Sequence, residues 1–164
     1  MADDTNKVIC DNCESTIDDD SDFCPFCGGL FLEDVKCEVH PDKDAIGVCV
    51  ICQSPICGSC AGRTDDYFLC KEHANYEIYQ GMARIYGTSD FALSEFVNDS
   101  LIKAGFHPFN YSRKTSPISL GGLDYSLYRA SGEFDGHIIN EIKIMVPLSE
   151  VIDAEKIIDE LELP

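Results

Sequence analysis

Basic residues and long apolar runs are both scarce in this 164-residue sequence. Twelve Lys and Arg residues stand against thirty Asp and Glu residues, and the formal net charge is −18. Residues 1–34 contain one basic residue, Lys7, and ten acidic ones. Nucleic-acid binding depends on Lys and Arg that neutralise phosphate, so we expect no nucleic-acid partner. The acidic surface favours a basic protein partner, and it serves equally well to keep the chain soluble.

No apolar run approaches the roughly 20 residues that a membrane-spanning helix needs. The opening residues, MADDTNKV, also lack the apolar stretch of a signal peptide. We therefore expect no membrane partner and a cytoplasmic protein.

Cysteine is absent from Met82 onward. That part of the chain is expected to fold by burying apolar surface alone.

The ten cysteines gather between residues 10 and 73, and with two histidines they form six pairs, each with two residues between its members. The pairs are Cys10/Cys13, Cys24/Cys27, Cys37/His40, Cys49/Cys52, Cys57/Cys60 and Cys70/His73. This spacing lets both members of a pair reach one ion. Twelve ligands are enough for three tetrahedral zinc ions. A disulfide framework is the alternative for an even number of cysteines, but histidine has no part in disulfides, and the paired spacing favours zinc.

The first two pairs follow the pattern C-x2-C-x10-C-x2-C over residues 10–27, close enough for one four-cysteine site. Gly28 and Gly29 free the backbone to turn under the metal, where N–H groups can donate to the thiolates. We expect Asp18–Asp22 to form the exposed tip between the pairs. The CPFCGG segment resembles the knuckle of short zinc-ribbon families. The resemblance implies a four-cysteine zinc ribbon with an acidic N-terminus over residues 1–34.

The other four pairs follow the pattern C-x2-H-x8-C-x2-C-x4-C-x2-C-x9-C-x2-H, and this spacing leaves open whether neighbouring or alternate pairs share an ion. The Cys-x-x-His-Pro opening, the alanine before the second pair and the aromatic residues before Cys70 resemble the B-box zinc finger over residues 35–73. The pair order fits the B-box better than the RING domain, because the first pair contains the histidine. The resemblance implies a cross-braced, two-zinc module over residues 35–75. One zinc would bind Cys37, His40, Cys57 and Cys60, and the other Cys49, Cys52, Cys70 and His73.

The third segment, residues 76–164, is predicted to be an α+β sandwich with the order β-α-β-β-β-α. MARIYGT predicts a strand in which Ala83, Ile85 and Gly87 share a face. The next apolar residues recur at helical spacing, with Ser89 or Asp90 as N-cap and Gly105 at the end. The predicted helical stripe consists of Leu93, Phe96, Val97, Leu101 and Ala104.

The remaining elements are a strand over residues 107–111, a hairpin and a closing helix. The hairpin joins residues 125–130 to 138–146 across the turn SGEFDG, and Ile142, Ile144 and Val146 share one face. Pro147 ends the last strand, Ser149 is a candidate cap, and the closing helix has an apolar stripe. That stripe consists of Val151, Ala154, Ile158 and Leu161. We expect the two helices on one face of a mainly antiparallel sheet.

LIKAGF at the end of the first helix and IKIMVPLSEVIDAEKIIDEL at the close resemble small signal-transducing domains grouped with PII-like proteins. The resemblance covers about eighty residues and implies a fold more safely than a function. The loop over residues 112–122 holds the adjacent pair Arg113 and Lys114. Such a loop would report ligand state in a PII-like protein, but Pro117 and two glycines favour a plain flexible link.

Catalytic zinc keeps an open coordination position, whereas each site here can be filled by four protein ligands, most of them thiolates. We therefore expect structural zinc and no enzyme activity. His107 and His137 have no partner at ligand spacing and are expected to be ordinary residues. The sequence favours a non-catalytic adaptor or regulatory protein that binds another protein. The alternative is a small-ligand sensor acting through residues 76–164, and the pattern names neither the partner nor an oligomeric state.

Overall fold

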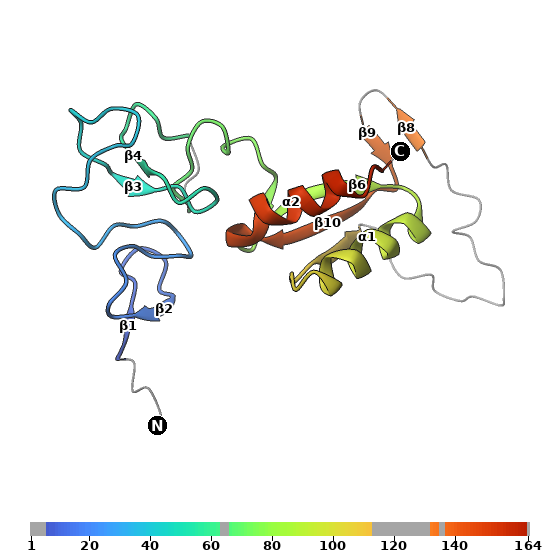
Figure 1. Ribbon diagram of the computed structural model, residues 1–164, viewed down its shortest axis with the longest axis horizontal. Coiled ribbons are helices and arrows are strands. Elements are labelled where there is room, and N and C mark those ends of the chain that lie inside the picture. The colour runs from blue at the N-terminus through green and yellow to red at the C-terminus, as the bar shows by residue number, and fades with distance from the viewer. Residues whose placement is uncertain (1–5, 63–65, 113–131, 135–136, 164) are drawn as a thin grey trace. The chain divides into compact units, whose positions relative to one another are not determined.

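The protein is represented by a computed structural model that describes residues 6–62, 66–112, 132–134 and 137–163 (Figure 1). The chain divides into two compact units, Met1–Tyr76 and Glu77–Pro164. All twelve predicted ligands lie in the first unit. The second contains no cysteine. The division into three domains at residues 34 and 75 stays a prediction. No helix among the described residues is both long enough and apolar enough to span a bilayer.

The first unit has little regular secondary structure. Strand β1 (Lys7–Ile9) pairs with β2 (Thr16–Asp18), and β3 (Gly47–Val48) pairs with β4 (Pro55–Ile56), both antiparallel. Its interior combines cysteine side chains with a few aliphatic ones. Those aliphatic side chains are Ile17, Val48, Val50, Ile51, Ile56 and Leu69. Six large aliphatic residues among the described part of this unit are a small core for its length, so the fold needs a further source of stability.

The second unit is built on a four-stranded antiparallel sheet with the strand order β5-β6-β10-β7. The strands are β5 (Ile78–Tyr79), β6 (Met82–Thr88), β7 (Phe109–Ser112) and β10 (Ile142–Pro147). A separate hairpin contains β8 (Gly132–Phe134) and β9 (His137–Ile139). Because β10 lies between β6 and β7, the last strand of the chain occupies the centre of the sheet.

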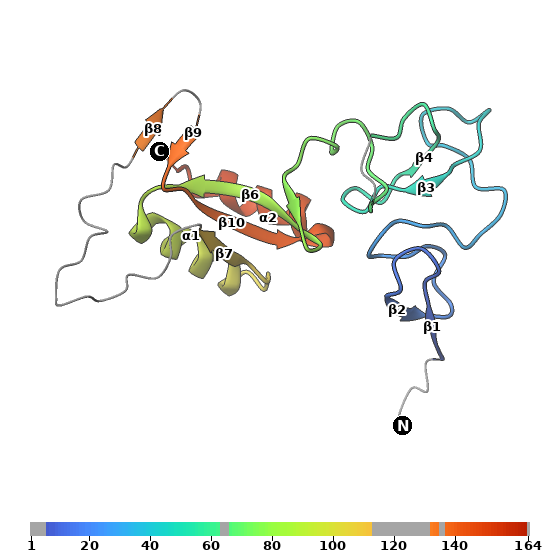
Figure 2. The same ribbon diagram turned by 180° about the vertical axis from the view of Figure 1, so that it is seen from behind.

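Helices α1 (Phe91–Lys103) and α2 (Val151–Glu160) pack on one face of this sheet, as predicted, and a 3₁₀ turn (Leu148–Glu150) leads into α2 (Figures 1 and 2). The fully buried side chains between the helices and the sheet come from both layers. They are Ala83, Val97, Leu101, Ile144, Val146, Val151 and Ala154. The first half of the predicted α2 stripe, Val151 and Ala154, is therefore confirmed as core.

The ends of α1 also agree with the sequence prediction. The Asp90 carboxylate accepts a hydrogen bond from the Leu93 N–H at 3.2 Å, as an N-cap does. Gly105, just past the helix, has φ +93°, a conformation that favours glycine. The predicted stripe is wrong at Phe96, which is 52% exposed, and at Ala104, which is also exposed. The buried line runs instead through Ser94, Val97 and Leu101, because spacings of three and four residues keep these on one side.

Several predicted strand details are wrong. A register shift between Ile144 and Met145 breaks the alternation in β6, so that Gly87 does not share the helix-facing side with Ala83. Residues 132–134 form a strand where the turn SGEFDG was predicted, and the long last strand is divided into β9 and β10. The predicted partner strand at residues 125–130 lies outside the described residues.

One strand of the second unit was not predicted, and one predicted cap is wrong. Ile78 and Tyr79 form β5, ahead of the first predicted strand, and pair with β6. Ser149 lies within the 3₁₀ turn, and no side chain caps either this turn or α2. Pro147 ends β10 as predicted.

Candidate metal centres

The first metal-ligand group brings together the four cysteines of residues 10–27. It consists of Cys10, Cys13, Cys24 and Cys27. The Sγ atoms of Cys10 and Cys27 are 3.7 Å apart, and those of Cys13 and Cys24 are 3.6 Å apart. Zn–S bonds of about 2.3 Å put the corners of a tetrahedron about 3.8 Å apart, whereas a disulfide bond is about 2.05 Å long. The spacing therefore fits four thiolates around one metal ion.

The backbone after Cys27 turns under this group, as expected from Gly28 and Gly29. The Gly29 N–H donates to the Cys27 sulfur at 3.4 Å. Gly28 has φ +83°, and its N–H donates to the Cys24 carbonyl at 2.8 Å, which closes the turn under the site. Such N–H donors stabilise a thiolate and orient it toward a metal. In the segment between the pairs, Asp19, Asp20 and Asp22 are exposed, whereas Asp18 is partly covered.

The remaining eight ligands form two groups in which alternate pairs come together. The second group consists of Cys37, His40, Cys57 and Cys60, and the third group consists of Cys49, Cys52, Cys70 and His73. Within each group, the ligand atoms all lie within 4.8 Å of one another. The interleaved arrangement is thus the one that the structure adopts, and each group ties together two stretches of chain about twenty residues apart.

Both histidines turn the Nδ1 atom toward the sulfurs. Nδ1 of His40 lies 3.1 Å from the Cys60 sulfur and 3.6 Å from that of Cys57. Nδ1 of His73 lies 3.1 Å from the Cys70 sulfur and 3.5 Å from that of Cys49. Zn–N and Zn–S bonds of usual length put these atoms about 3.5 Å apart. The three groups are therefore suited to metal ions and are consistent with zinc.

The thiols within each group differ in acidity. Burial raises the pKa of Cys24 to about 12 and that of Cys70 to about 11. Burial and the neighbouring Cys37 sulfur raise the pKa of Cys60 to about 11. Burial also opposes ionisation of Cys37, but hydrogen bonds from the backbone of His40 and Cys57 outweigh it and lower its pKa to about 6. Each group thus contains a thiol that is protonated at pH 7 without metal and must lose its proton to serve as a thiolate ligand.

The first group is joined directly to the third. The Phe68 N–H donates to the Cys27 carbonyl at 2.8 Å, and the Val48 N–H donates to the Gly28 carbonyl at the same distance. Val48 precedes Cys49, and Phe68 lies two residues before Cys70. The backbone that leads into the third group is therefore hydrogen-bonded to the turn beneath the first group. Sequence reasoning missed this connection, since backbone hydrogen bonds leave no signature in ligand spacing.

The residues outside the clusters are placed as follows. Glu150 accepts hydrogen bonds from the His107 N–H at 2.9 Å and from His107 Nδ1 at 2.7 Å. Among the described residues, His107 belongs to none of the three metal-ligand groups, and the side chain of His137 lies outside the description. Of the loop at residues 112–122, only Ser112 is described, and it belongs to β7.

Comparisons with family models, with curated proteins and with solved structures found no match for this chain. The fold and the site themselves define the class. In its described residues, the chain has three Cys/His clusters suited to metal ions in one unit, and its second unit is a small sheet-rich one that contains two helices.

Proposed function

We propose that this protein is a non-catalytic, zinc-dependent adaptor or regulator that presents rigid, metal-built surfaces to a protein partner. The observation that carries the proposal is that each cluster has four protein ligands. A cluster filled in this way has no open position for water or substrate, which is the arrangement of structural zinc. Structural zinc contributes on the order of 10–16 kcal/mol of apparent binding energy, and in small domains that energy stabilises the fold.

In this proposal, residues 1–34 are a zinc ribbon, residues 35–75 are a B-box-like module and residues 76–164 are a PII-like signal-transducing domain. Support for the first two comes from the ligand groupings and from the interleaving of alternate pairs. Support for the third comes from two helices on one face of an antiparallel sheet. Ten cysteines that serve as ligands must stay reduced, and this fits the proposed cytoplasmic location.

The surface of the first unit supports a protein partner. Large apolar side chains are exposed around the clusters, although apolar residues in so small a unit are needed inside. They are Val8, Ile9, Phe26, Phe31, Leu32, Val39 and Ile46. With three zinc ions and ten thiolates bound, the net charge falls to about −22. An acidic surface with exposed apolar side chains favours a partner that is basic and carries an apolar patch of its own.

The test is affinity capture with the zinc-loaded chain, compared with the double variant Phe26→Ser/Leu32→Ser. Both side chains are about half exposed, so the variant should keep its zinc and its fold. The control is Phe96→Ser, which removes an equally exposed ring from the second unit. We expect a partner that the wild-type and control chains bind and the double variant loses. A partner bound equally by the double variant and by metal-stripped chain would contradict the proposal.

A second candidate is a small-ligand sensor that acts through residues 76–164. A cavity of about 350 Å³ on the sheet of this unit favours it, since ligand pockets are usually about 300–1,000 Å³ in volume. A thermal-shift screen of metabolites on the full chain tests this candidate. A saturable rise in the unfolding temperature of the second unit supports the sensor. A screen without any such rise would contradict the sensor, and the adaptor would remain as the one proposed role.

A further inference from the structure

The sheet face turned away from the helices carries a row of aromatic and sulfur-containing side chains. Directly paired residues point to the same face of an antiparallel sheet. Tyr79 pairs with Met82, and Phe109 pairs with Met145. The neighbours of Met145 in sequence, Ile144 and Val146, are fully buried under the helices. Tyr79, Met82, Phe109 and Met145 therefore share the open face.

This face is hollowed into the cavity of about 350 Å³. Its lining consists of Glu77, Ile78, Tyr79, Gln80, Met82, Phe109, Tyr111, Lys143 and Met145. Met145 is buried at the floor, whereas Tyr79 is 59% exposed, Phe109 56% and Tyr111 37%. Large rings are usually covered in a folded protein, and three on one concave face indicate a place where something binds.

Two of the rings meet although their strands lie at opposite edges of the sheet. Tyr79 is on β5 and Tyr111 on β7, with β6 and β10 between them. Their ring centroids are 6.0 Å apart and their planes are inclined by 40°. Both side chains must lean across the central strands to come this close. Two tilted rings at this separation form a corner whose electron-rich faces a cation can contact within about 6 Å.

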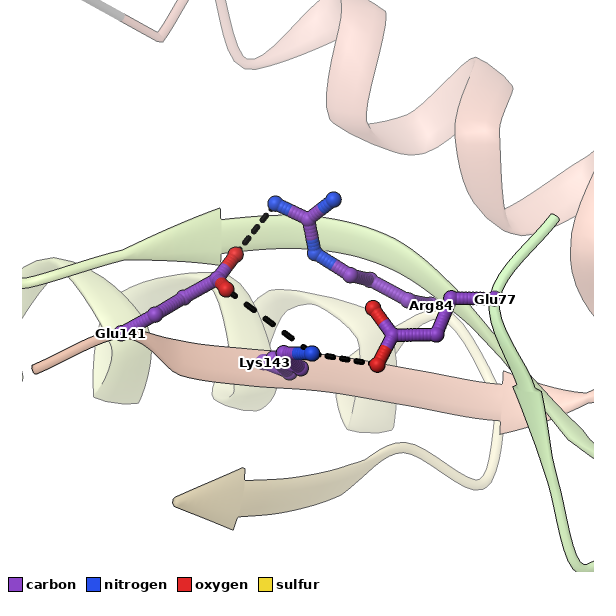
Figure 3. A network of polar contacts seen from close by, with 4 residues as sticks. All are labelled: Glu77, Arg84, Glu141 and Lys143. Carbon is purple, nitrogen blue, oxygen red and sulfur yellow. Dashed lines mark hydrogen bonds and ion pairs between the residues drawn. The ribbon is translucent and has the colours of Figure 1, made fainter. Parts of the chain in front are cut away.

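The charges beside this corner favour a cation over an anion. Lys143 is the one basic side chain among the described residues lining the cavity, and it is paired with Glu77. Glu141 lies 4.0 Å from the Lys143 ammonium on its other side (Figure 3). The Lys143 side chain is only 18% exposed, whereas that of Glu77 is 51% exposed. The Lys143 ammonium is thus covered and lies between two carboxylates, whereas about half of the Glu77 side chain stays open to a second cation.

The network beside the cavity continues into a second ion pair. Arg84 is paired with Glu141, on the same face (Figure 3). Both side chains lie over Gly87, where any Cβ atom would collide with them. The second basic group of the network is therefore also engaged by a carboxylate. The lack of a side chain at Gly87 leaves room for this pair.

From these observations we propose that the cavity binds a small organic cation of the quaternary-ammonium type. Its methyl groups would contact the rings of Tyr79, Phe109 and Tyr111, and its charge would face the Glu77 carboxylate. Such a ligand combines an apolar surface, which suits the rings and the two methionines, with the charge that this acidic chain attracts. The inference rests on the ligand-sensor candidate and does not depend on the zinc clusters.

The experiment is a titration of the full-length, zinc-loaded chain with choline, followed by the broadening of the choline N-methyl proton resonance. The matched neutral ligand is 3,3-dimethylbutan-1-ol, which has the same shape and no charge. We expect saturable choline binding in the millimolar range and roughly tenfold weaker binding of the neutral alcohol, a ratio typical of a partly desolvated cation–π contact. Equal binding of the two ligands, or no saturation with choline, would overturn the inference.

Protein variants locate the binding. Tyr111→Leu should weaken choline binding at least about fivefold, whereas Tyr111→Phe keeps the ring and should retain it. Phe96→Leu removes an exposed ring on α1 and should change nothing. If Tyr111→Leu does not fold, Tyr79→Leu tests the same corner at a more exposed position. Choline binding that survives loss of the ring would overturn the inference. A neutral or anionic ligand that the metabolite screen places in this cavity would also overturn it, while the sensor candidate would stand.

Discussion

The carbonyl oxygen of Gly28 accepts a hydrogen bond from the Val48 N–H at 2.8 Å, and this bond joins the turn beneath the four-cysteine cluster to the strand that enters the third cluster. Gly28 has φ +83°, and a Cβ atom there would collide with the Val48 carbonyl and approach the Phe68 side chain. The two zinc modules predicted from the sequence are thus held together through a position that only glycine fits.

Gly28→Ala should therefore destabilise the first unit. A non-glycine residue in this conformation costs about 1–3 kcal/mol, and the collision with Val48 adds to that cost. The expected result is faster zinc release to a chelator and a lower unfolding temperature for the first unit alone. Gly58→Ala is the matched control, because nothing lies within 4 Å of a Cβ atom at that position. If the Gly28 and Gly58 variants released zinc at the same rate, the connection would be irrelevant to stability.

Cys57→Ala should unfold the module that contains the second cluster and leave the second unit folded. Cys57 and Cys60 bring the central chain to Cys37 and His40, so losing one ligand opens a cross-braced fold that has few buried aliphatic residues. We expect the zinc content to fall by at least one ion per chain, with proteolysis across residues 35–73 and protection of residues 82–164. Ser59→Ala, in the same turn, is the control. Retained protease resistance across residues 35–73 would contradict this prediction.

Glu150→Ala should destabilise the second unit by about 1 kcal/mol, since the carboxylate accepts two hydrogen bonds from His107. These bonds join the start of α2 to the segment leading into β7. Asp153→Ala is the control, because Asp153 pairs with Lys156 on the exposed side of α2, where an ion pair adds little. Chemical denaturation of the second unit measures both. Equal effects of the two substitutions would show that the His107–Glu150 pair is no more than a surface contact.

Zinc binding should release protons at pH 7, and zinc affinity should rise with pH. Cys24, Cys60 and Cys70, one in each cluster, have pKa values raised to about 12, 11 and 11, chiefly by burial. Without metal these thiols are protonated at pH 7, and a thiolate ligand must lose that proton. Because these pKa values are raised, folding of the metal-free chain favours the protonated thiols. The stabilisation that results is present below pH 9, the ordinary thiol pKa, and is lost as the pH rises from there through the raised pKa values. Titration of metal-free chain with zinc in weakly buffered solution should release at least one proton per cluster, and a titration without proton release would contradict the assignment of thiolate ligands.

The ligand groups were more accessible to sequence reasoning than the rest of the fold, because cysteine and histidine at fixed spacing encode geometry locally. The pairing of Cys37/His40 with Cys57/Cys60 needed the B-box resemblance, since spacing alone also allowed neighbouring pairs to share an ion. In the second unit, the sequence marked both ends of α1. Asp90 marked the start as an N-cap, and Gly105 marked the end because glycine readily adopts the left-handed backbone that follows a helix. Phe96 was misplaced because its apolar character suggested a buried position that the helix geometry gives to Ser94.

Other features arise from contacts that no local pattern records. The bulge between Ile144 and Met145 depends on two strands more than fifty residues apart, and it moves Gly87 to the open face. The Tyr79–Tyr111 corner likewise joins two edge strands across the sheet. Neither residue stood out in the sequence, since single aromatic residues in alternating strands usually belong to the core.

The metal-built fold of the first unit is tested most directly by the metal and thiol content of natively purified protein. We expect three zinc atoms per chain by elemental analysis. We also expect ten cysteines that react with thiol reagents only after denaturation with a chelator, because all twelve ligands would be engaged. Substantially fewer than three zinc atoms, or disulfide-linked peptides among residues 10–70 by mass spectrometry, would contradict it.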